Sequence, residues 1–321
     1  MPDSQLTLPK TGITADGFLT DSWYLAAASA ELKAGTQQRV MLLGEPVMVG
    51  RTPAGEAFAL RDICPHRLVP LSAGKQIETD GQWTVECPYH GWRFGTDGGC
   101  KLMPSLTEAT PHDPSKVKVR RYPVHEANGA VCIYIAHDPR SYEPPAMAPP
   151  DFGPLPEKPK FIIHDMLNAH MDDAVAGLMD PAELPLVPRM RGWAVERHVP
   201  GSSSRLYRWL FGGDVMTEIW FQLPGYRWEI ISSARARLVT LTCLTPEAPK
   251  RTRITQFTWW TGAPLLSLAV PVTQRKAHQK AMLWADDIDM QAKWYEMLKR
   301  EWTAARSEGR EFTNPIEPRA S

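Results

Sequence analysis

The chain has 321 residues, with 36 basic and 36 acidic side chains and therefore a formal net charge of zero. Nucleic acids and anionic membranes select basic surfaces, so this balance predicts that neither is the main partner. Hydrophobic residues make up 43% of the chain and charged residues 22%, which excludes a disordered protein. No apolar run approaches the roughly 18 residues of a membrane helix. Five cysteines, and a start that lacks the basic-then-apolar order of a secretory signal, predict a cytoplasmic location.

Short strands are predicted between residues 20 and 135, where brief apolar stretches alternate with Gly, Pro and polar residues. Because no helix longer than one or two turns is needed there, residues 1–136 are predicted to form a small all-β domain. Residues 137–160 are dominated by proline, which predicts an extended connector. A second domain is then expected over residues 161–321.

The second domain is predicted to begin with a strand over residues 161–170 and a helix over residues 172–183, with Asp172 or Asp173 at the N-terminal end of that helix. A helix is also expected from about residue 274 to residue 306. Six strand-like runs lie between the two helices, at residues 192–199, 204–211, 215–223, 226–233, 236–244 and 252–260. Consecutive strands with short connections favour an antiparallel sheet, so the fold class is α+β.

Two Cys–His pairs are the strongest chemical signal in the sequence. Cys64 and His66 form a Cys-x-His pair, and Cys87 and His90 form a Cys-x-x-His pair. Two thiolates and two imidazoles suit either a tetrahedral zinc ion or a Rieske [2Fe–2S] cluster. Here each loop supplies one Cys and one His, so two facing loops can give both sulfurs to one iron and both nitrogens to the other. The spacing therefore favours the cluster.

Around these pairs the sequence resembles the N-terminal domain of Rieske non-haem iron oxygenases, most closely the vanillate O-demethylase-like group. The segments that carry the resemblance are LTDSWYLAAASAEL, LLGEPVMVGRT, ALRDICPHRLVPLSAGK and CPYHGWRFGTDGGCKLMPSL. It implies a Rieske domain followed by a helix-grip (START-like) sheet domain with a long C-terminal helix. Leu68 is a departure, because the family commonly has Gly there.

Val69 and Tyr89 stand where respiratory Rieske proteins have two extra cysteines, which favours the oxygenase branch. The cysteines outside the two pairs, Cys100, Cys132 and Cys243, are predicted to be buried free thiols.

The resemblance also implies a mononuclear Fe(II), bound by two His and one carboxylate in the second domain. In the family an Asp-x-x-His-x4-His segment supplies the histidines, and LMDPAELPLVPR matches its surroundings. Asp180 falls on the family's Asp, which bridges to a cluster His of the neighbouring subunit. Glu183 and Pro188 fall on the two His positions. Because proline has no side-chain donor atom, the iron site is expected to be degenerate.

The family's third iron ligand is a carboxylate on the C-terminal helix, and the best placement puts Gln291 there; a slip of the alignment would bring in Asp287 or Asp289. Other residues offer a rebuilt site of unusual ligands. His164 and His170 share a face of the predicted strand, but six residues at about 3.3 Å each separate them by roughly 20 Å. His170 with Asp172 or Asp173 and Glu183 is an alternative, and surface or core roles for these histidines are another.

For function, the resemblance implies that an NAD(P)H-dependent reductase or ferredoxin reduces the cluster. Electrons then reach a mononuclear iron that activates O₂ for hydroxylation or oxidative demethylation. Family trimers place each cluster beside the iron of the next subunit. We therefore expect a trimer or hetero-hexamer in which this chain serves a catalytically complete homologous subunit. The alternatives are a self-sufficient Rieske monooxygenase with a nonstandard iron site and a non-enzymatic Rieske ligand-binding protein.

The substrate is not evident from the sequence. Five tryptophans of the second domain either line an apolar cavity or are ordinary core residues: Trp193, Trp220, Trp228, Trp259 and Trp260.

Overall fold

The structure is a computed structural model. It describes residues 12–107, 113–140, 145, 148–179, 188–191, 194–200, 209, 212–213, 216–262 and 288–310. The chain divides into two compact units, one of Asp21–Gly153 and the other of Met1–Thr20 together with Pro154–Ser321. The sequence analysis predicted two domains and a connector, at residues 1–136, 161–321 and 137–160 respectively. These ranges stay a prediction.

The unit Asp21–Gly153 is built from strands and single 3₁₀ turns. Its strands are β1 (Ser22–Ala28), β2 (Thr36–Leu42), β3 (Glu45–Arg51), β4 (Ala57–Arg61), β5 (Lys75–Thr79), β6 (Gln82–Glu86), β7 (Arg93–Gly95), β8 (Cys100–Leu102), β9 (Arg121–Tyr122), β10 (Val124–Ala127) and β11 (Ala130–Ile135). The 3₁₀ turns are η1 (Ser29–Glu31), η2 (Leu71–Ala73) and η3 (Pro114–Lys116).

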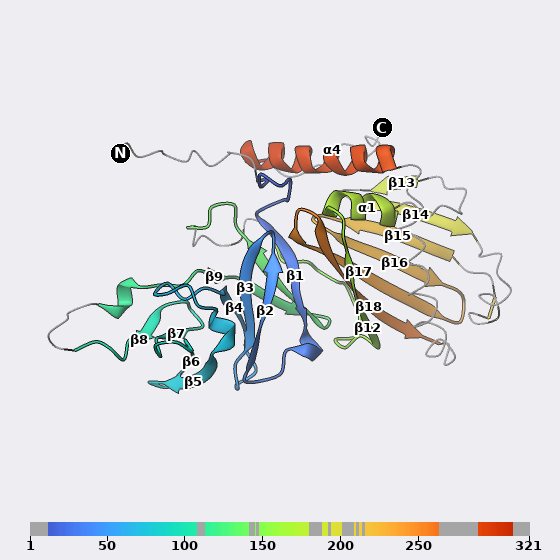
Figure 1. Cartoon of the computed structure of the whole chain (residues 1–321). Coiled ribbons are helices and arrows are strands. Elements are labelled where there is room, and N and C mark those ends of the chain that lie inside the picture. The colour runs from blue at the N-terminus through green and yellow to red at the C-terminus, as the bar shows by residue number, and fades with distance from the viewer. Residues whose placement is uncertain are drawn as a thin grey trace. The chain divides into compact units, whose positions relative to one another are not determined.

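These strands form three antiparallel sheets, in the orders β1-β11-β10, β2-β3-β4-β9 and β5-β6-β7-β8 (Figure 1). The four-stranded sheets share an apolar core that includes Phe58, Leu60 and Phe94. The strand Ala57–Arg61 is apolar from Ala57 to Leu60 and buries Phe58, Ala59 and Leu60 in succession, so both of its faces are covered. The all-β prediction for this part of the chain is confirmed among the described residues.

The second unit is a seven-stranded antiparallel sheet with two described α-helices. Its strands are β12 (Phe161–Leu167), β13 (Pro188–Arg191), β14 (Ala194–Pro200), β15 (Met216–Gln222), β16 (Tyr226–Ser232), β17 (Arg237–Ala248) and β18 (Arg251–Thr261), and its helices are α1 (Met171–Met179) and α4 (Ile288–Ser307). The strand order is β12-β18-β17-β16-β15-β14-β13. The predicted α+β fold is thereby confirmed, including the C-terminal helix. Of the expected strand over residues 204–211 the structure describes only Trp209, and the helical stretch 274–287 lies outside the described residues.

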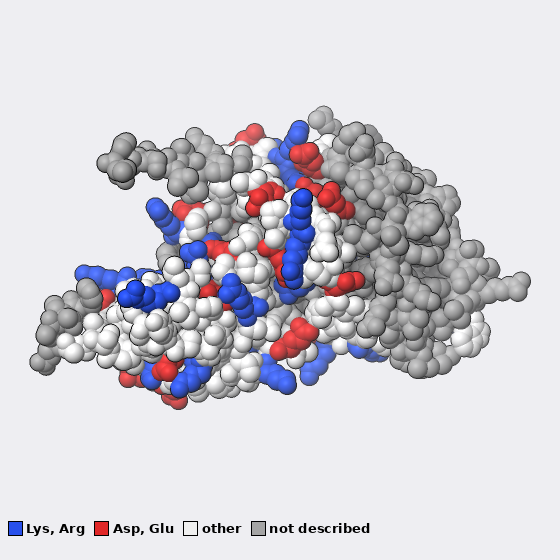
Figure 2. All heavy atoms as spheres, in the orientation of Figure 1, with Lys and Arg blue, Asp and Glu red and all other residues white. Residues whose placement is uncertain are grey.

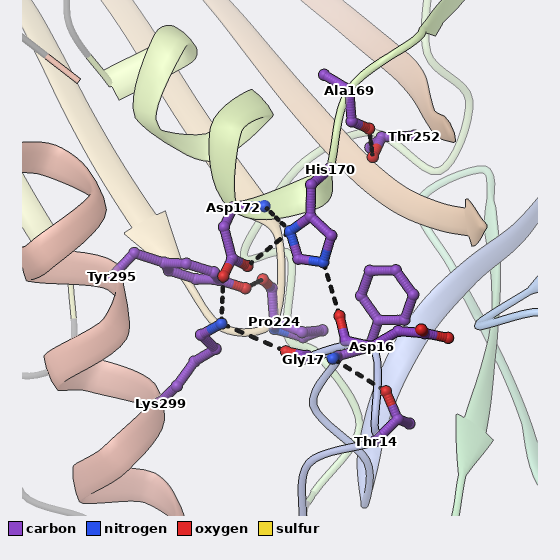
Figure 3. Close-up of polar contacts among 11 residues, drawn as sticks. Thr14, Asp16, Gly17, Ala169, His170, Asp172, Pro224, Thr252, Tyr295 and Lys299 are labelled. Atoms are coloured by element: carbon purple, nitrogen blue, oxygen red, sulfur yellow. Dashed lines mark hydrogen bonds and ion pairs between the residues drawn. The ribbon is translucent and has the colours of Figure 1, made fainter. Parts of the chain in front are cut away.

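Residues 12–20, near the N-terminus, belong to the second unit, and the sequence analysis did not predict this. Lys299 of α4 is buried, pairs with the carboxylate of Asp172 and donates to the carbonyl oxygen of Gly17 at 3.3 Å (Figure 3). Tyr295, one turn earlier on α4, donates its hydroxyl to the carbonyl oxygen of Pro224 at 2.8 Å. These contacts fix α4 against α1, the sheet and the N-terminal segment.

The charge pattern of the visible surface agrees with the balanced composition. On the face shown in Figure 2, Lys and Arg side chains are interspersed with Asp and Glu rather than gathered into one basic patch. Among the described residues, no helix has the length and apolar character needed to cross a membrane.

Candidate metal centre

The first Cys–His pair lies on a tight loop that leaves β4. The N–H of Cys64 donates to the carbonyl oxygen of Val69, and the N–H of Leu68 donates back to the carbonyl oxygen of Cys64, both at 2.9 Å. These two bonds close the loop and hold Cys64, which is 1% exposed, at its base. His66 lies at the exposed tip.

The second pair lies on a loop between β6 and β7 that has the same hydrogen-bond pattern. The N–H of Cys87 donates to the carbonyl oxygen of Trp92 at 2.8 Å, and the N–H of Gly91 donates to the carbonyl oxygen of Cys87 at 3.1 Å. Cys87 is 3% exposed at the base, and His90 is exposed near the tip. The two loops are therefore repeats of one turn, each with a buried thiol and an exposed imidazole.

The two thiols lie side by side in the apolar core. Burial, followed by the neighbouring Cys87 thiol, raises the pKa of Cys64 to about 11. A metal ligand has to be the thiolate, and two adjacent buried thiolates need positive charge between them. The thiol pair thus fits a site that receives metal ions. The other three cysteines are buried and form no disulfide, as predicted.

The two imidazoles meet at the surface. The ring centroids of His66 and His90 are 4.8 Å apart. His66 also stacks on Trp92, with centroids 4.7 Å apart and planes 3° from parallel, and Tyr89 lies against His90 at 3.8 Å. Desolvation, then the charges of His90 and Arg67, lower the pKa of His66. A lowered pKa favours the neutral imidazole, which is the form that binds metal.

The pairs are arranged with the sulfurs inside and the nitrogens outside. A zinc ion would require all four donors around one point. Among the described residues, no three His, Cys, Asp or Glu side chains converge in the manner of ligands to a single ion. Two thiols on one side and two imidazoles on the other match the donor set of a Rieske [2Fe–2S] cluster, with one pair for each iron.

A buried carboxylate secures the first loop, and the sequence analysis missed it. Asp62 is 1% exposed and accepts hydrogen bonds from the N–H and the hydroxyl of Ser72, both at 2.7 Å. Arg39 lies 3.7 Å from the same carboxylate. Asp62 and Ser72 stand on either side of the loop, so these bonds join its ends. The signal in the sequence was an Asp two residues before the Cys-Pro-His segment.

The positions matched to the family's mononuclear iron are only partly described. Asp180 and Glu183 lie outside the described residues. Pro188 begins β13 and is paired with Arg197 of β14, so it lies on a strand. Gln291 lies in the first turn of α4. Since proline offers no donor atom, these residues do not supply the family's two-His set.

The structure corrects the placement of His170. The strand β12 ends at Leu167, and His170 instead caps α1, where its Nδ1 accepts the N–H of Asp172 at 3.1 Å (Figure 3). The other ring nitrogen, Nε2, then donates to the carbonyl oxygen of Asp16 at 2.8 Å, and the ring stacks on Phe18. Both nitrogens are engaged inside the protein, so His170 offers no free nitrogen to an iron ion in this structure. The rebuilt site with Glu183, which lies outside the described residues, stays a prediction.

His164 does lie on the β12 strand, as predicted, and its Nδ1 contacts the hydroxyl of Thr255 at 3.1 Å. Of the five tryptophans singled out from the sequence, the structure describes the side chains of Trp228, Trp259 and Trp260, and these three do not share one face of the sheet. Trp228 and Trp259 point to one face of the sheet and Trp260 to the other, because Trp228 is paired through Leu241 with Phe257 and Trp260 has the opposite alternation.

Comparisons of the sequence with known proteins also indicate a Rieske [2Fe-2S] domain. Residues 22–123 match the profile of the Rieske [2Fe-2S] domain. The chain is 39% identical over 127 residues to the 3-chlorobenzoate-3,4-dioxygenase oxygenase subunit of Comamonas testosteroni, covering 39% of this chain and 28% of that protein. It is 38% identical over 136 residues to the dicamba O-demethylase oxygenase component of Stenotrophomonas maltophilia, covering 42% of this chain and 37% of the relative. The matched part is thus well under two thirds of either relative.

The fold of the chain as a whole is also found among solved structures. Apo dicamba monooxygenase matches with a TM-score of 0.64 and 22% identity, covering 92% of this chain and 91% of that one. At this identity the likeness establishes the fold.

The profile, the paired loops and the fold define a protein with a Rieske [2Fe–2S] domain followed by a helix-grip sheet unit. The chain therefore contains a Rieske [2Fe-2S] domain and is similar, over that part, to the oxygenase components of Rieske oxygenases, which is the resemblance that its motifs indicated.

Proposed function

We propose that this chain is an electron-transferring component of a Rieske oxygenase, with Cys64, His66, Cys87 and His90 as the cluster ligands. The observation that carries this proposal is the repeated loop, which presents one buried thiol and one exposed imidazole from each side. A bound [2Fe–2S] cluster supplies one-electron redox chemistry at such a site.

The two cysteines, the two histidines and Trp92 have different roles at that site. Cys64 and Cys87 lie in the apolar core and exclude water from the sulfur side. His66 and His90 lie at the surface, so they form the edge through which electrons enter and leave. Trp92 holds the His66 ring by stacking. A reductase or ferredoxin that draws on NAD(P)H would reduce the centre from this exposed side.

We further propose that the iron that activates O₂, for hydroxylation or oxidative demethylation, belongs to a partner subunit. The support is chemical, since Pro188 stands at a position where the family uses histidine and has no atom to donate. In the resulting trimer or hetero-hexamer, Asp180 would bridge to a cluster His of the neighbouring subunit, and the corresponding Asp of the partner would join this chain's cluster to the partner's iron. The five buried cysteines, none of them in a disulfide, suit the cytoplasmic location proposed with it.

Two other functions differ from this one in metal content. A self-sufficient monooxygenase with a nonstandard iron site would bind a third iron. A non-enzymatic Rieske ligand-binding protein would bind two irons but would support no oxygenation with any partner.

Metal analysis with EPR spectroscopy of the anaerobically purified chain tests the proposal. We expect two irons and two inorganic sulfides per chain, and a Rieske EPR signal on reduction. Zinc without sulfide would overturn the cluster assignment. Three irons together with turnover by this chain alone would overturn the partner-iron assignment and favour the self-sufficient enzyme.

A further inference from the structure

A buried carboxylate lies at the base of the first cluster loop. Asp62 is 1% exposed, and its backbone N–H donates to the carbonyl oxygen of Pro46 at 2.9 Å. Cys64, which is also 1% exposed, follows two residues later. Consecutive Cα atoms are 3.8 Å apart, so the Cα atoms of Asp62 and Cys64 are separated by no more than about 7.6 Å. The carboxylate and the proposed ligand therefore share one loop base, away from bulk water.

The partners of Asp62 are those of an ionised carboxylate. Its Oδ1 accepts the N–H of Ser72 and its Oδ2 accepts the hydroxyl of Ser72, both at 2.7 Å. A guanidinium nitrogen of Arg39 lies 3.7 Å from Oδ2. An ionised carboxylate can only accept hydrogen bonds, and here donors meet both of its oxygens. The loop base therefore contains a fixed negative charge.

Arg39 balances this charge only in part. The side chain of Arg39 is 45% exposed, whereas that of Asp62 is 0% exposed. Water and salt screen an exposed charge much more strongly than a buried one. In the described part of the unit Asp21–Gly153, no Lys or Arg side chain is buried. The negative charge of Asp62 therefore dominates the field on the buried side of the loop.

We propose that the charge of Asp62 lowers the reduction potential of the [2Fe–2S] cluster. Reduction adds one electron, which the redox partner loses, and a nearby negative charge in a medium of low effective dielectric disfavours that electron. A lower potential makes the reduced cluster a stronger electron donor. The inference rests on the proposed function, because it concerns the cluster that Cys64 helps to bind. Asp62 itself is no ligand and acts on the cluster only through its field.

A redox titration of the anaerobically purified full chain tests the inference. Dithionite supplies the electron, and the Rieske EPR signal reports the reduced fraction at each potential. Asp62→Asn removes the charge but keeps an oxygen that can accept the N–H of Ser72. At an effective dielectric constant of about 20, a unit charge roughly 10 Å away changes a one-electron equilibrium by about tenfold. We therefore expect the cluster of Asp62→Asn to be about tenfold easier to reduce, a rise of about 59 mV.

Three further variants separate the charge from the structure of the loop. Ser72→Ala weakens the closure of the loop but keeps the charge, so the potential should stay near that of the wild type. Arg39→Gln removes the cation beside the carboxylate, so the potential should fall. Asp21→Asn is the matched control, since Asp21 is 4% exposed and accepts the N–H of His137 at 3.0 Å. It precedes β1, whose sheet carries neither cluster loop, and the potential should not change.

The outcomes distinguish this inference from the proposed function. An unchanged or lower potential in Asp62→Asn, or an equal rise in Ser72→Ala or Asp21→Asn, would overturn the inference and leave the proposed function intact, because the cluster is still present. A wild-type chain without a reducible cluster would overturn both. If Asp62→Asn does not retain the cluster, the exposed Arg39→Gln variant decides the matter. A lower potential in Arg39→Gln then supports the inference, and an unchanged or higher one contradicts it.

Discussion

Leu68 occupies in the first cluster loop the place that Gly91 occupies in the second. Each is four residues after its cysteine, each donates its N–H to that cysteine's carbonyl oxygen, and each has a positive φ, +59° for Leu68 and +70° for Gly91. Glycine adopts this conformation without steric cost, whereas a side chain collides with the neighbouring carbonyl. The family's usual Gly at the position of Leu68 thus has a physical reason, and Leu68 is 72% exposed, so packing does not offset the strain.

Replacing Leu68 with Gly should therefore stabilise the protein. The left-handed conformation costs a leucine about 1–2 kcal/mol, part of which the flexible unfolded glycine chain returns, so we expect a net gain of about 1 kcal/mol. Thermal unfolding followed by circular dichroism measures the effect. The converse change, Gly91→Ala, should lower stability, because it adds strain and places a Cβ 3.2 Å from Pro104. An unchanged or lower melting temperature for Leu68→Gly would contradict the equivalence of the two loops.

Replacing Cys64 with Ser should abolish the cluster, because a serine hydroxyl is a poor ligand for iron at neutral pH. Iron content, inorganic sulfide and the EPR signal should all be lost. Cys100→Ala is the matched control, since Cys100 is 6% exposed in the same apolar core but is not a proposed ligand. It should keep the cluster and cost about 1 kcal/mol through the small cavity that it leaves. Loss of iron in Cys100→Ala with retention in Cys64→Ser would reverse the assignment of ligands.

Removing the Asp62 carboxylate should loosen the first cluster loop. Asp62→Ala leaves the N–H and hydroxyl of Ser72 without their acceptor. We expect the unfolding free energy to fall by about 3 kcal/mol, because each hydrogen bond to a charged group is worth about 1.5–3 kcal/mol. Ser72→Ala removes only the hydroxyl bond and should lower the unfolding free energy by about 1.5 kcal/mol, half of the loss in Asp62→Ala. Urea unfolding of both variants measures the two losses of unfolding free energy and so checks their ratio. Equal effects would show that the backbone N–H of Ser72 contributes nothing to the closure.

The ion pair between Arg51 and Glu126 should make stability depend on pH. It joins β3 to β10 through two bonds, at 2.9 and 2.6 Å, and the bond from Arg51 lowers the pKa of Glu126 from its usual value of 4.5. A lowered carboxyl pKa stabilises the fold above pH 4.5, and that contribution is lost as the pH falls through the folded-state pKa.

The melting temperature of Glu126→Gln should therefore lie below that of the wild type at pH 7, and the gap should close in acid, below pH 4.5. Glu56→Gln, which removes the same charge at an exposed position of the same unit, should show little gap at any pH. A gap for Glu126→Gln that stays constant down to pH 3 would contradict the role of the carboxylate charge.

The sequence by itself determined the parts of this protein that depend on neighbouring residues. Brief apolar stretches bounded by Gly, Pro and polar residues predicted strands in both units, because the residues that favour a strand and those that end it are neighbours in the sequence. The two Cys–His pairs predicted a two-loop centre, since each pair comes from one short turn. Comparison of Cys64–Val69 with Cys87–Trp92 could also have revealed the repeated loop, which we recognised only from its hydrogen bonds.

Only the tertiary structure decided where distant residues meet. The N-terminal segment joins the second unit because Lys299 and His170, far along the chain, bond to its backbone. The sequence analysis placed His170 on a strand, because no local pattern shows that the strand ends three residues earlier. The hydrogen bond from the N–H of Asp172 to Nδ1 of His170 shows that His170 caps α1 instead. The hydrogen bond from Gln256 to Thr242 depends on the register of β17 and β18, and register is fixed by packing between segments that no local pattern connects.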